Sequence, residues 1–166
     1  SSHEVGHTLG LPHNMGSSSS IPVEKLRDKA WVEANGHTPS IMDYARFNYV
    51  AQPEDNISPS GLYPRIGEYD LWSIEWGYKP ILDQTEEQEK QTLNEWVKAR
   101  YSNNKLRFLQ QDGIDPRSQT ECLGDNNMKA GEYGIKNLKW IVPKIQGKKK
   151  EKGENYETLT EIYNEV

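Results

Sequence analysis

Three histidines and a glutamate near the start of the chain have the types and spacing of a metal site. Residues 3–13 read H-E-V-G-H-T-L-G-L-P-H, with His3, His7 and His13 as potential ligands. His3 and His7 are four residues apart, so on a helix their imidazoles lie on one face about one turn apart and can bind one ion. Imidazole nitrogen is a preferred ligand of zinc. The motif therefore predicts a zinc site with two ligands on a helix and a third just after it.

The residues between the second and third histidine indicate how that third ligand returns to the site. Gly10 is the residue type that lets a helix end in a left-handed conformation, and Pro12 prevents the chain from resuming the helix at once. His13 can then swing back toward the metal. Three neutral imidazoles leave a fourth position open, which is typical of catalytic zinc, whereas structural zinc sites usually have four protein ligands.

Glu4 lies beside the first ligand, where a carboxylate suits a general base acting on water better than it suits a metal ligand. The alternative is a surface helix whose histidines are ordinary polar residues. Five fixed positions at this spacing arise by chance in about one chain in 10⁵ at ordinary residue frequencies, which favours the metal site.

The same stretch resembles the metzincin metallopeptidases, and it is most similar to the matrixin and serralysin versions of the motif. Those enzymes also have a tight turn that carries a methionine beneath the zinc, and residues 40–44, S-I-M-D-Y, fit this turn. The run from Trp31 to Asp55 resembles a branch of large bacterial zinc-dependent metallopeptidases of the Bacteroidetes type. The resemblance implies that Met42 packs under the histidines as a support and is not a ligand.

Several residues around this turn have open roles. Tyr44 matches the tyrosine that in astacin-like and serralysin-like enzymes reaches the metal or the reaction oxyanion, so the resemblance implies a catalytic hydroxyl; the alternative is a core or surface tyrosine. Asp43 departs from the histidine common at that position, and could instead orient a zinc histidine. His37 is surplus as a ligand, and either contacts the substrate or a ligand, or makes local hydrogen bonds.

Composition limits the class of protein. The chain has 166 residues, 34% of them hydrophobic, and a mean hydropathy of −0.92, which is low for a self-sufficient core and suggests that part of the core is missing. A net charge of −5 argues against nucleic acid as a partner, and no apolar run approaches the ~20 residues of a membrane span. Cys122, the single cysteine, forms no internal disulfide.

Periodicity predicts a series of helices with few other elements. The expected helices cover residues 23–34, 67–78, 85–101, 127–141 and 156–166, while residues 14–20 are expected to form a mobile loop. Gly77 should close the second helix, with Leu71, Ile74 and Tyr78 along one apolar stripe, and Thr85 should cap the third. In the fourth helix, Ile135, Leu138 and Ile141 should face inward. Asp70 is similar to the aspartate that braces the methionine turn in serralysins and matrixins, although an acidic first turn favouring the helix dipole explains it equally well.

The fold class expected from these observations is mainly α. The resemblance implies that residues 1–80 form the C-terminal half of a metzincin catalytic domain, that residues 81–166 form a helical extension packed on it, and that the sheet lies upstream in the same polypeptide. The helix that carries His3 should begin several residues earlier, so the chain alone is expected to be a weak or inactive peptidase.

The function expected is zinc-dependent hydrolysis of peptide bonds, with a peptide or protein as the substrate and Zn²⁺ as the cofactor. Glu4 would be the base, and Tyr44 would assist at the oxyanion. Two alternatives are a non-catalytic zinc-binding or assembly module of a larger secreted protein, and a zinc hydrolase acting on a non-peptide amide. The resemblance also implies an extracytoplasmic location.

Overall fold

The computed structural model describes residues 2–111, 113–147 and 157–164, and in these ranges the chain forms helices and turns without a strand. The mainly α fold class is therefore confirmed. The α-helices are α1 (Ser2–Thr8), α2 (Lys29–Asn35), α3 (Pro59–Leu62), α4 (Glu68–Tyr78), α5 (Glu86–Arg100), α6 (Asn127–Gly147) and α7 (Glu157–Asn164). The 3-10 helices are η1 (Ser17–Ser20), η2 (Val23–Leu26), η3 (Pro53–Asp55) and η4 (Asn104–Leu106).

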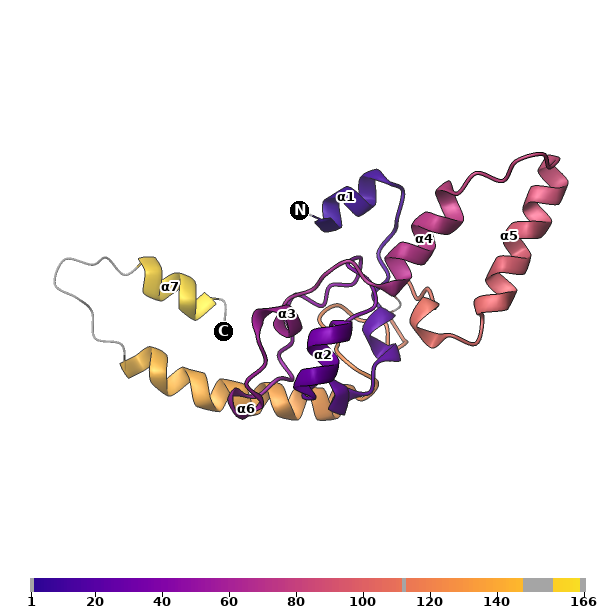
Figure 1. Ribbon diagram of the computed structural model, residues 1–166. Coiled ribbons are helices and arrows are strands. Elements are labelled where there is room, and N and C mark those ends of the chain that lie inside the picture. Colours follow the sequence, from indigo (N-terminus) through magenta and orange to yellow (C-terminus); the bar gives the residue numbers. More distant parts are fainter. Residues whose placement is uncertain (1, 112, 148–156, 165–166) are drawn as a thin grey trace.

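The helices surround a central region of turns (Figure 1). The long helix α6 lies along one edge, and α1 lies at the opposite edge. Helices α4 and α5 project to one side, and α7 lies on the opposite side, next to the C-terminal part of α6. No described helix is both long enough and apolar enough to cross a membrane.

One hydrophobic core joins the first half of the chain to the second. Its buried members are Ile21, Val23, Leu26, Ala45, Val50, Leu123 and Ala130, with Trp31, Tyr49 and Tyr133 packed against them. Leu123 and Ala130 come from the predicted extension and are fully buried among residues of the predicted catalytic half. The two ranges therefore share a core, and the boundary at residue 80 stays a prediction.

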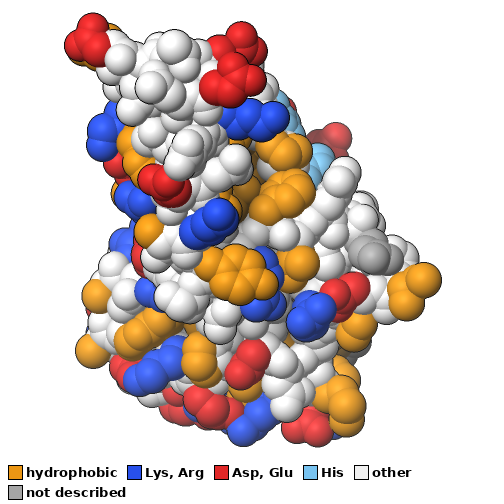
Figure 2. Space-filling model, turned by 90° about the vertical axis from the view of Figure 1, so that its right-hand side faces the viewer, with side chains coloured by type: hydrophobic (Ala, Val, Ile, Leu, Met, Phe, Trp, Pro, Cys, Tyr) orange, Lys and Arg blue, Asp and Glu red, His pale blue; other side chains and the backbone are white. Residues whose placement is uncertain are grey.

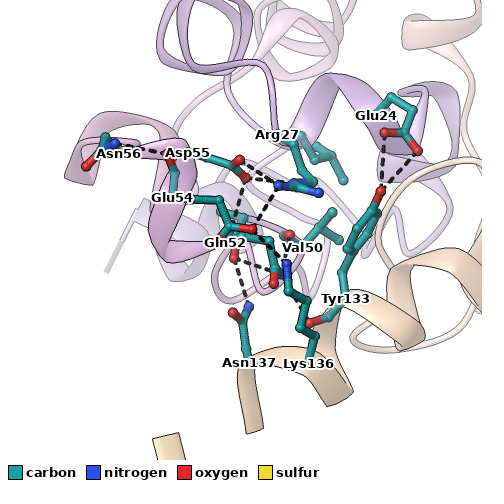
Figure 3. A network of polar contacts seen from close by, with 12 residues as sticks. Glu24, Arg27, Val50, Gln52, Glu54, Asp55, Asn56, Tyr133, Lys136 and Asn137 are labelled. Atoms are coloured by element: carbon teal, nitrogen blue, oxygen red, sulfur yellow. Dashed lines mark hydrogen bonds and ion pairs between the residues drawn. The ribbon is translucent and has the colours of Figure 1, made fainter. Parts of the chain in front are cut away.

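A polar network fastens α6 to this core (Figure 3). The Arg27 guanidinium makes two hydrogen bonds to the Asp55 carboxylate, at 2.8 and 2.7 Å, and lies 4.8 Å from the centre of the Tyr133 ring. The side-chain amide of Gln52 donates to the carbonyl of Tyr133 at 3.1 Å, and that of Asn137 donates to the carbonyl of Ala51 at 2.8 Å. Paired in this way, the polar groups hold α6 in place beside the loops.

The single helix predicted for residues 23–34 is wrong, because the chain forms η2 and α2 with a break at Asp28. The Asp28 side chain accepts a hydrogen bond from the backbone N–H of Trp31 at 3.1 Å, as an N-cap does. A capping residue has extended backbone dihedrals, so it starts a new helix and cannot continue the previous one.

The helix predicted for residues 67–78 is present as α4, but it differs from the prediction in two ways. Gly77 lies inside the helix and does not close it, and Lys79 is the C-cap. Leu71 and Tyr78, expected on one apolar stripe, are exposed, whereas Tyr69 and Asp70 are the buried residues. The buried residues of the helix therefore lie in its first turn.

The two long downstream helices match their predicted positions better than their predicted faces. Thr85 caps α5 as expected, with its side chain accepting from the N–H of Gln88. Helix α6 runs past the predicted end at residue 141, and its Ile135 and Leu138 are exposed. The start of the helix predicted for residues 156–166 lies outside the described residues.

The loop predicted to be mobile at residues 14–20 is instead buried over much of its length. Asn14 and Ser18 are almost fully buried, and residues 17–20 form η1. The backbone N–H of Gly16 donates to the carbonyl of Leu109 at 3.1 Å, and the Ser18 hydroxyl donates to that of Cys122 at 2.9 Å. Bonds to such distant parts of the chain cannot be deduced from a serine-rich sequence.

Candidate metal centre

The structure brings the three predicted histidines together. One ring nitrogen from each of His3, His7 and His13 lies within 4.8 Å of the others. The Nε2 atoms of His7 and His13 are 3.0 Å apart, and the three ring centroids are separated by 4.6 to 5.2 Å. His7 is exposed, and the other two are partly buried, so the cluster opens to solvent at one edge.

The end of α1 returns the third histidine to the first two. Gly10 has a φ of +82°. Its N–H donates to the carbonyl of His7 at 2.9 Å, and the N–H of Leu11 donates to that of Gly6 at 3.0 Å. This pair of bonds is the Schellman motif, which ends a helix in a left-handed residue. The role predicted for Gly10 is confirmed, and Pro12 then carries the chain to His13.

Backbone carbonyls select the tautomers of two histidines. The Nδ1 of His3 lies 2.7 Å from the carbonyl oxygen of Ile41, and the Nδ1 of His7 lies 2.9 Å from that of Leu11. A carbonyl can only accept, so each Nδ1 carries the proton and donates it. In the neutral ring the Nε2 then presents a lone pair, which is the form that binds a metal.

These donors fit a zinc ion. The Nε2 of His3 is buried without a hydrogen-bond partner, and the Nε2 of His7, a lone-pair atom, faces the Nε2 of His13. Zinc binds imidazole nitrogen at about 2.0–2.1 Å, which places tetrahedral ligand atoms roughly 3.3 Å apart. Burial lowers the pKa of His13, and the neighbouring His7 and His3 lower it further, so its neutral form is favoured.

Met42 lies directly under α1. Its side chain is fully buried, and a Cβ placed on Gly6 would be 2.3 Å from the Met42 sulfur. The Met42 carbonyl accepts from the N–H of Asn14 at 3.0 Å, next to His13. Sequence reasoning missed Gly6 and Asn14. A glycine inside a helix between two ligands was a usable signal, because glycine weakens a helix unless close packing requires it.

The brace predicted for Asp70 is confirmed by its hydrogen bonds. Its carboxylate accepts from the Ser40 hydroxyl at 2.7 Å, and from the N–H groups of Ile41 and Gly67 at 2.8 Å each. The first two partners belong to the methionine turn, and the third precedes α4. Because the carbonyl of Ile41 binds His3, Asp70 holds the backbone that orients a proposed ligand.

Glu4 and Tyr44 both lie at the cluster. The Tyr44 ring centroid is 4.6 Å from that of His13 and 5.3 Å from that of His3. Glu4 is exposed on α1, and its charge acts to raise the pKa of His13 against the effect of burial. Tyr44 thus packs against two of the three rings, and Glu4 is near enough for its charge to act on His13.

The other two uncertain residues act away from the cluster. His37 is fully buried, and its Nε2 lies 2.8 Å from the carbonyl oxygen of Ala45, which supports local hydrogen bonding over substrate contact. Asp43 accepts from the N–H of Ser18 at 2.8 Å and from the Thr38 hydroxyl at 3.1 Å. The Nδ1 atoms of His3 and His7 use backbone carbonyls, so Asp43 orients neither of them.

An apolar cavity of about 690 Å³ adjoins the turn between His7 and His13. Residues 9–12 form one wall, and aromatic side chains of α4 and the segment after η4 form another, among them Trp72, Trp76 and Phe108. Figure 2 shows hydrophobic side chains gathered next to the histidines on this face. The surroundings of the cluster are therefore strongly apolar on this side.

A histidine cluster at the end of a short helix, above a buried methionine, defines a metzincin-like zinc site. The chain belongs to the Met-zincin family, whose match extends over residues 1–166. The family match confirms the resemblance to the metzincins. Membership implies a zinc cofactor and a protein of the metallopeptidase class. Neither a curated protein nor a solved structure gave a match to the chain.

Proposed function

We propose that this protein is a zinc-dependent endopeptidase whose metal is bound by His3, His7 and His13. The observation that carries the proposal is the orientation of the imidazoles: carbonyls bind the Nδ1 atoms of His3 and His7. The Nε2 of His7 then faces the Nε2 of His13, and the Nε2 of His3 is buried without a hydrogen-bond partner. Three neutral nitrogens leave a position for water and substrate, as catalytic zinc requires.

When bound, zinc supplies Lewis acidity to water and to the scissile carbonyl. The Glu4 carboxylate accepts a proton from the attacking water and then delivers it to the leaving amine, so that one side chain serves as base and acid in turn. The Tyr44 hydroxyl, carried beside His13, donates a hydrogen bond to the oxyanion that develops on the carbonyl oxygen. The substrate is a peptide or protein.

Two substitutions on α1 test the proposal. His7→Ala should lose zinc in elemental analysis, whereas His37→Gln, which alters the one histidine outside the cluster, should keep it. In the longer polypeptide that includes the expected upstream sheet, Glu4→Gln should keep zinc and lose cleavage of a quenched fluorescent peptide library, because the base and the ligands are different residues. Full zinc content in His7→Ala would refute the ligand set, and undiminished cleavage by Glu4→Gln would refute the base.

The alternative is a non-catalytic zinc-binding or assembly module of a larger secreted protein. Glu4 argues against it, because a structural site has no use for an exposed carboxylate beside the first ligand. An extracytoplasmic location is proposed on the resemblance to the bacterial metallopeptidases alone. Zinc binding by the wild-type chain together with no effect of Glu4→Gln in any hydrolysis assay would favour the module.

A further inference from the structure

We propose that Gly6 is a positioning residue of the metal site: its missing side chain lets the Met42 thioether pack under α1 and so sets the position of the histidines on that helix. The inference rests on the proposed zinc site. It adds to that site a residue at a position where the ligand motif specifies no residue type. The evidence for it is the close contact between Gly6 and Met42, together with the bonds that link these two residues to the histidines.

The contact is too close for any side chain at position 6. A Cβ on Gly6 would be 2.3 Å from the Met42 sulfur, 3.3 Å from its Cε and 3.7 Å from its Cγ. Carbon and sulfur pack at roughly 3.5–4.0 Å, so a methyl group would force a shift of about 1.5 Å. Met42 is fully buried in a close-packed interior, so its flexible side chain can make room only by repacking against its neighbours.

The cost of a glycine at this position indicates that the space is needed. Glycine inside a helix is less favourable than alanine by about 0.5–1 kcal/mol, and α1 has only seven residues. Gly6 is the buried residue of α1, while Val5 and His7 on either side are exposed. The helix therefore faces the molecule through the residue that has no side chain.

The contact reaches the ligands through short paths. Gly6 precedes His7 directly, and its carbonyl accepts the N–H of Leu11 in the turn that leads to His13. On the other side, Met42 follows Ile41, whose carbonyl binds His3. The separation of α1 from the methionine turn thus governs all three rings. Zinc ligands must lie within about 0.2 Å of their ideal distances, so a shift of more than an ångström is large.

The test is a double-mutant cycle on zinc affinity, measured by competition with a chromophoric chelator. Gly6→Ala should weaken zinc binding by about 10- to 100-fold, the range found for residues that orient metal ligands. Met42→Ala removes the sulfur, so adding Gly6→Ala in that background should cost far less. Gly131→Ala is the matched control, because a Cβ at this helical glycine meets nothing within 4 Å; its zinc affinity should equal that of the wild type.

The outcomes separate positioning from general stability and from the zinc site itself. Equal losses from Gly6→Ala in the two backgrounds, or wild-type affinity in the single variant, would overturn the inference. A folded Gly6→Ala protein with lower melting temperature but unchanged zinc affinity would reduce Gly6 to a packing role and also overturn it. A wild-type chain that binds no zinc would refute the proposed function, and the melting temperatures of the same four metal-free proteins would still measure the contact.

Discussion

Single residues prepare the imidazoles for a metal before one is bound. The carbonyls of Ile41 and Leu11 hold the Nδ1 protons of His3 and His7, so each ring is fixed in orientation and tautomer. Metal binding normally requires ligands to be deprotonated and ordered. The fold meets the second of these requirements, which lowers the cost of assembling the site.

Tyr44→Phe should slow turnover more than it weakens substrate binding. The ring of Tyr44 packs beside His13 and would stay in place, while the hydroxyl that we propose acts on the oxyanion would be lost. We expect kcat to fall by about 10²-fold or more with KM little changed, measured on a single cleaved peptide. Phe47→Leu, at an exposed position near the turn, provides the control. An unchanged kcat would make Tyr44 a packing residue.

Asp43 should make stability fall as the pH rises. Burial raises the pKa of this carboxyl from 3.8 to about 7, although hydrogen bonds from Ser18 and Thr38 partly oppose the effect. The folded state then keeps a proton that the unfolded chain loses, so the contribution is complete below about pH 4 and is lost as the pH rises through 7.

This contribution can be isolated by comparing the wild type with Asp43→Asn, which does not titrate. In denaturant titrations with a metal chelator present, the wild type should lose up to about 1.4 kcal/mol of unfolding free energy per pH unit relative to the variant, between pH 4 and 7. The buried histidines change stability in both proteins alike. Parallel profiles of the two proteins would show that Asp43 ionises normally.

The ligands could be predicted from the sequence, but their supports could be predicted only in part. Spacing alone places His3 and His7 on one helical face, and Gly10 marks the turn that returns His13. The backbone partners of Asn14, and the N–H of Ser18 that bonds Asp43, were not predictable, because they lie far away in the sequence. The Asn14 side chain, for example, donates to the carbonyl of Arg107 and accepts from the N–H of Leu109.

At the scale of elements, α1 is too short to be stable alone. Isolated helices of fewer than about 12–15 residues are marginal in water, and α1 has seven. Its structure depends on contacts at its end and its buried face: the Tyr78 hydroxyl donates to the carbonyl of Leu9 at 2.9 Å, and Met42 packs against Gly6. Helix α4 thus supports the metal site at both ends, through Tyr78 and through Asp70.

Loss of the Thr85 cap should have a local effect, whereas loss of the Asp28 cap should destabilise the whole protein. Thr85 caps α5, which has no buried residue, whereas Asp28 caps α2, which packs against α3 and η2. Each side chain accepts a backbone N–H, and replacing such a cap by alanine costs about 1 kcal/mol. Thr85→Ala should speed hydrogen exchange only in the first turn of α5. Asp28→Ala should lower the melting temperature of the whole protein, and equal global effects would contradict this assignment.

The sequence located the helices better than it located their faces. The capping signal at Thr85 and the apolar spacing of residues 127–141 depend on neighbouring residues in the sequence. Both therefore predicted the positions of helices correctly. Which side of a helix is buried depends on its neighbours. Helix α6 meets the core through Ala130 and Tyr133 and is held by the side-chain amide of Asn137, whereas its Ile135 remains 54% exposed.

At the scale of the whole molecule, the segment from residue 107 to 125 joins the surroundings of the metal site to the core. The carbonyl of Leu109 accepts from Gly16, the N–H of Asp125 donates to the carbonyl of Ile21, and its side chain accepts from the N–H of Val23. These bonds hold the chain that follows His13. Residues beyond 80 therefore support the structure on which the ligands lie.

A chain ending at residue 80 should consequently fail to fold, whereas a chain ending at residue 147 should keep the core. The shorter chain loses Leu123 and Ala130 from the core and leaves buried backbone groups of residues 14–23 without partners. Burial of one leucine contributes about 1.5–3 kcal/mol, and each buried unpaired polar group costs about 1–3 kcal/mol. Together these losses are comparable to the whole stability of a domain, about 5–15 kcal/mol.

Near-ultraviolet circular dichroism and cooperative thermal unfolding distinguish the two truncated chains. The chain ending at residue 147 lacks α7, none of whose described side chains belongs to the core cluster, so its transition should resemble that of the full chain. The chain ending at residue 80 should show no cooperative transition. If it unfolded cooperatively and bound zinc with wild-type affinity, residues 1–80 would be an autonomous domain, and the shared core would be an interface between two units.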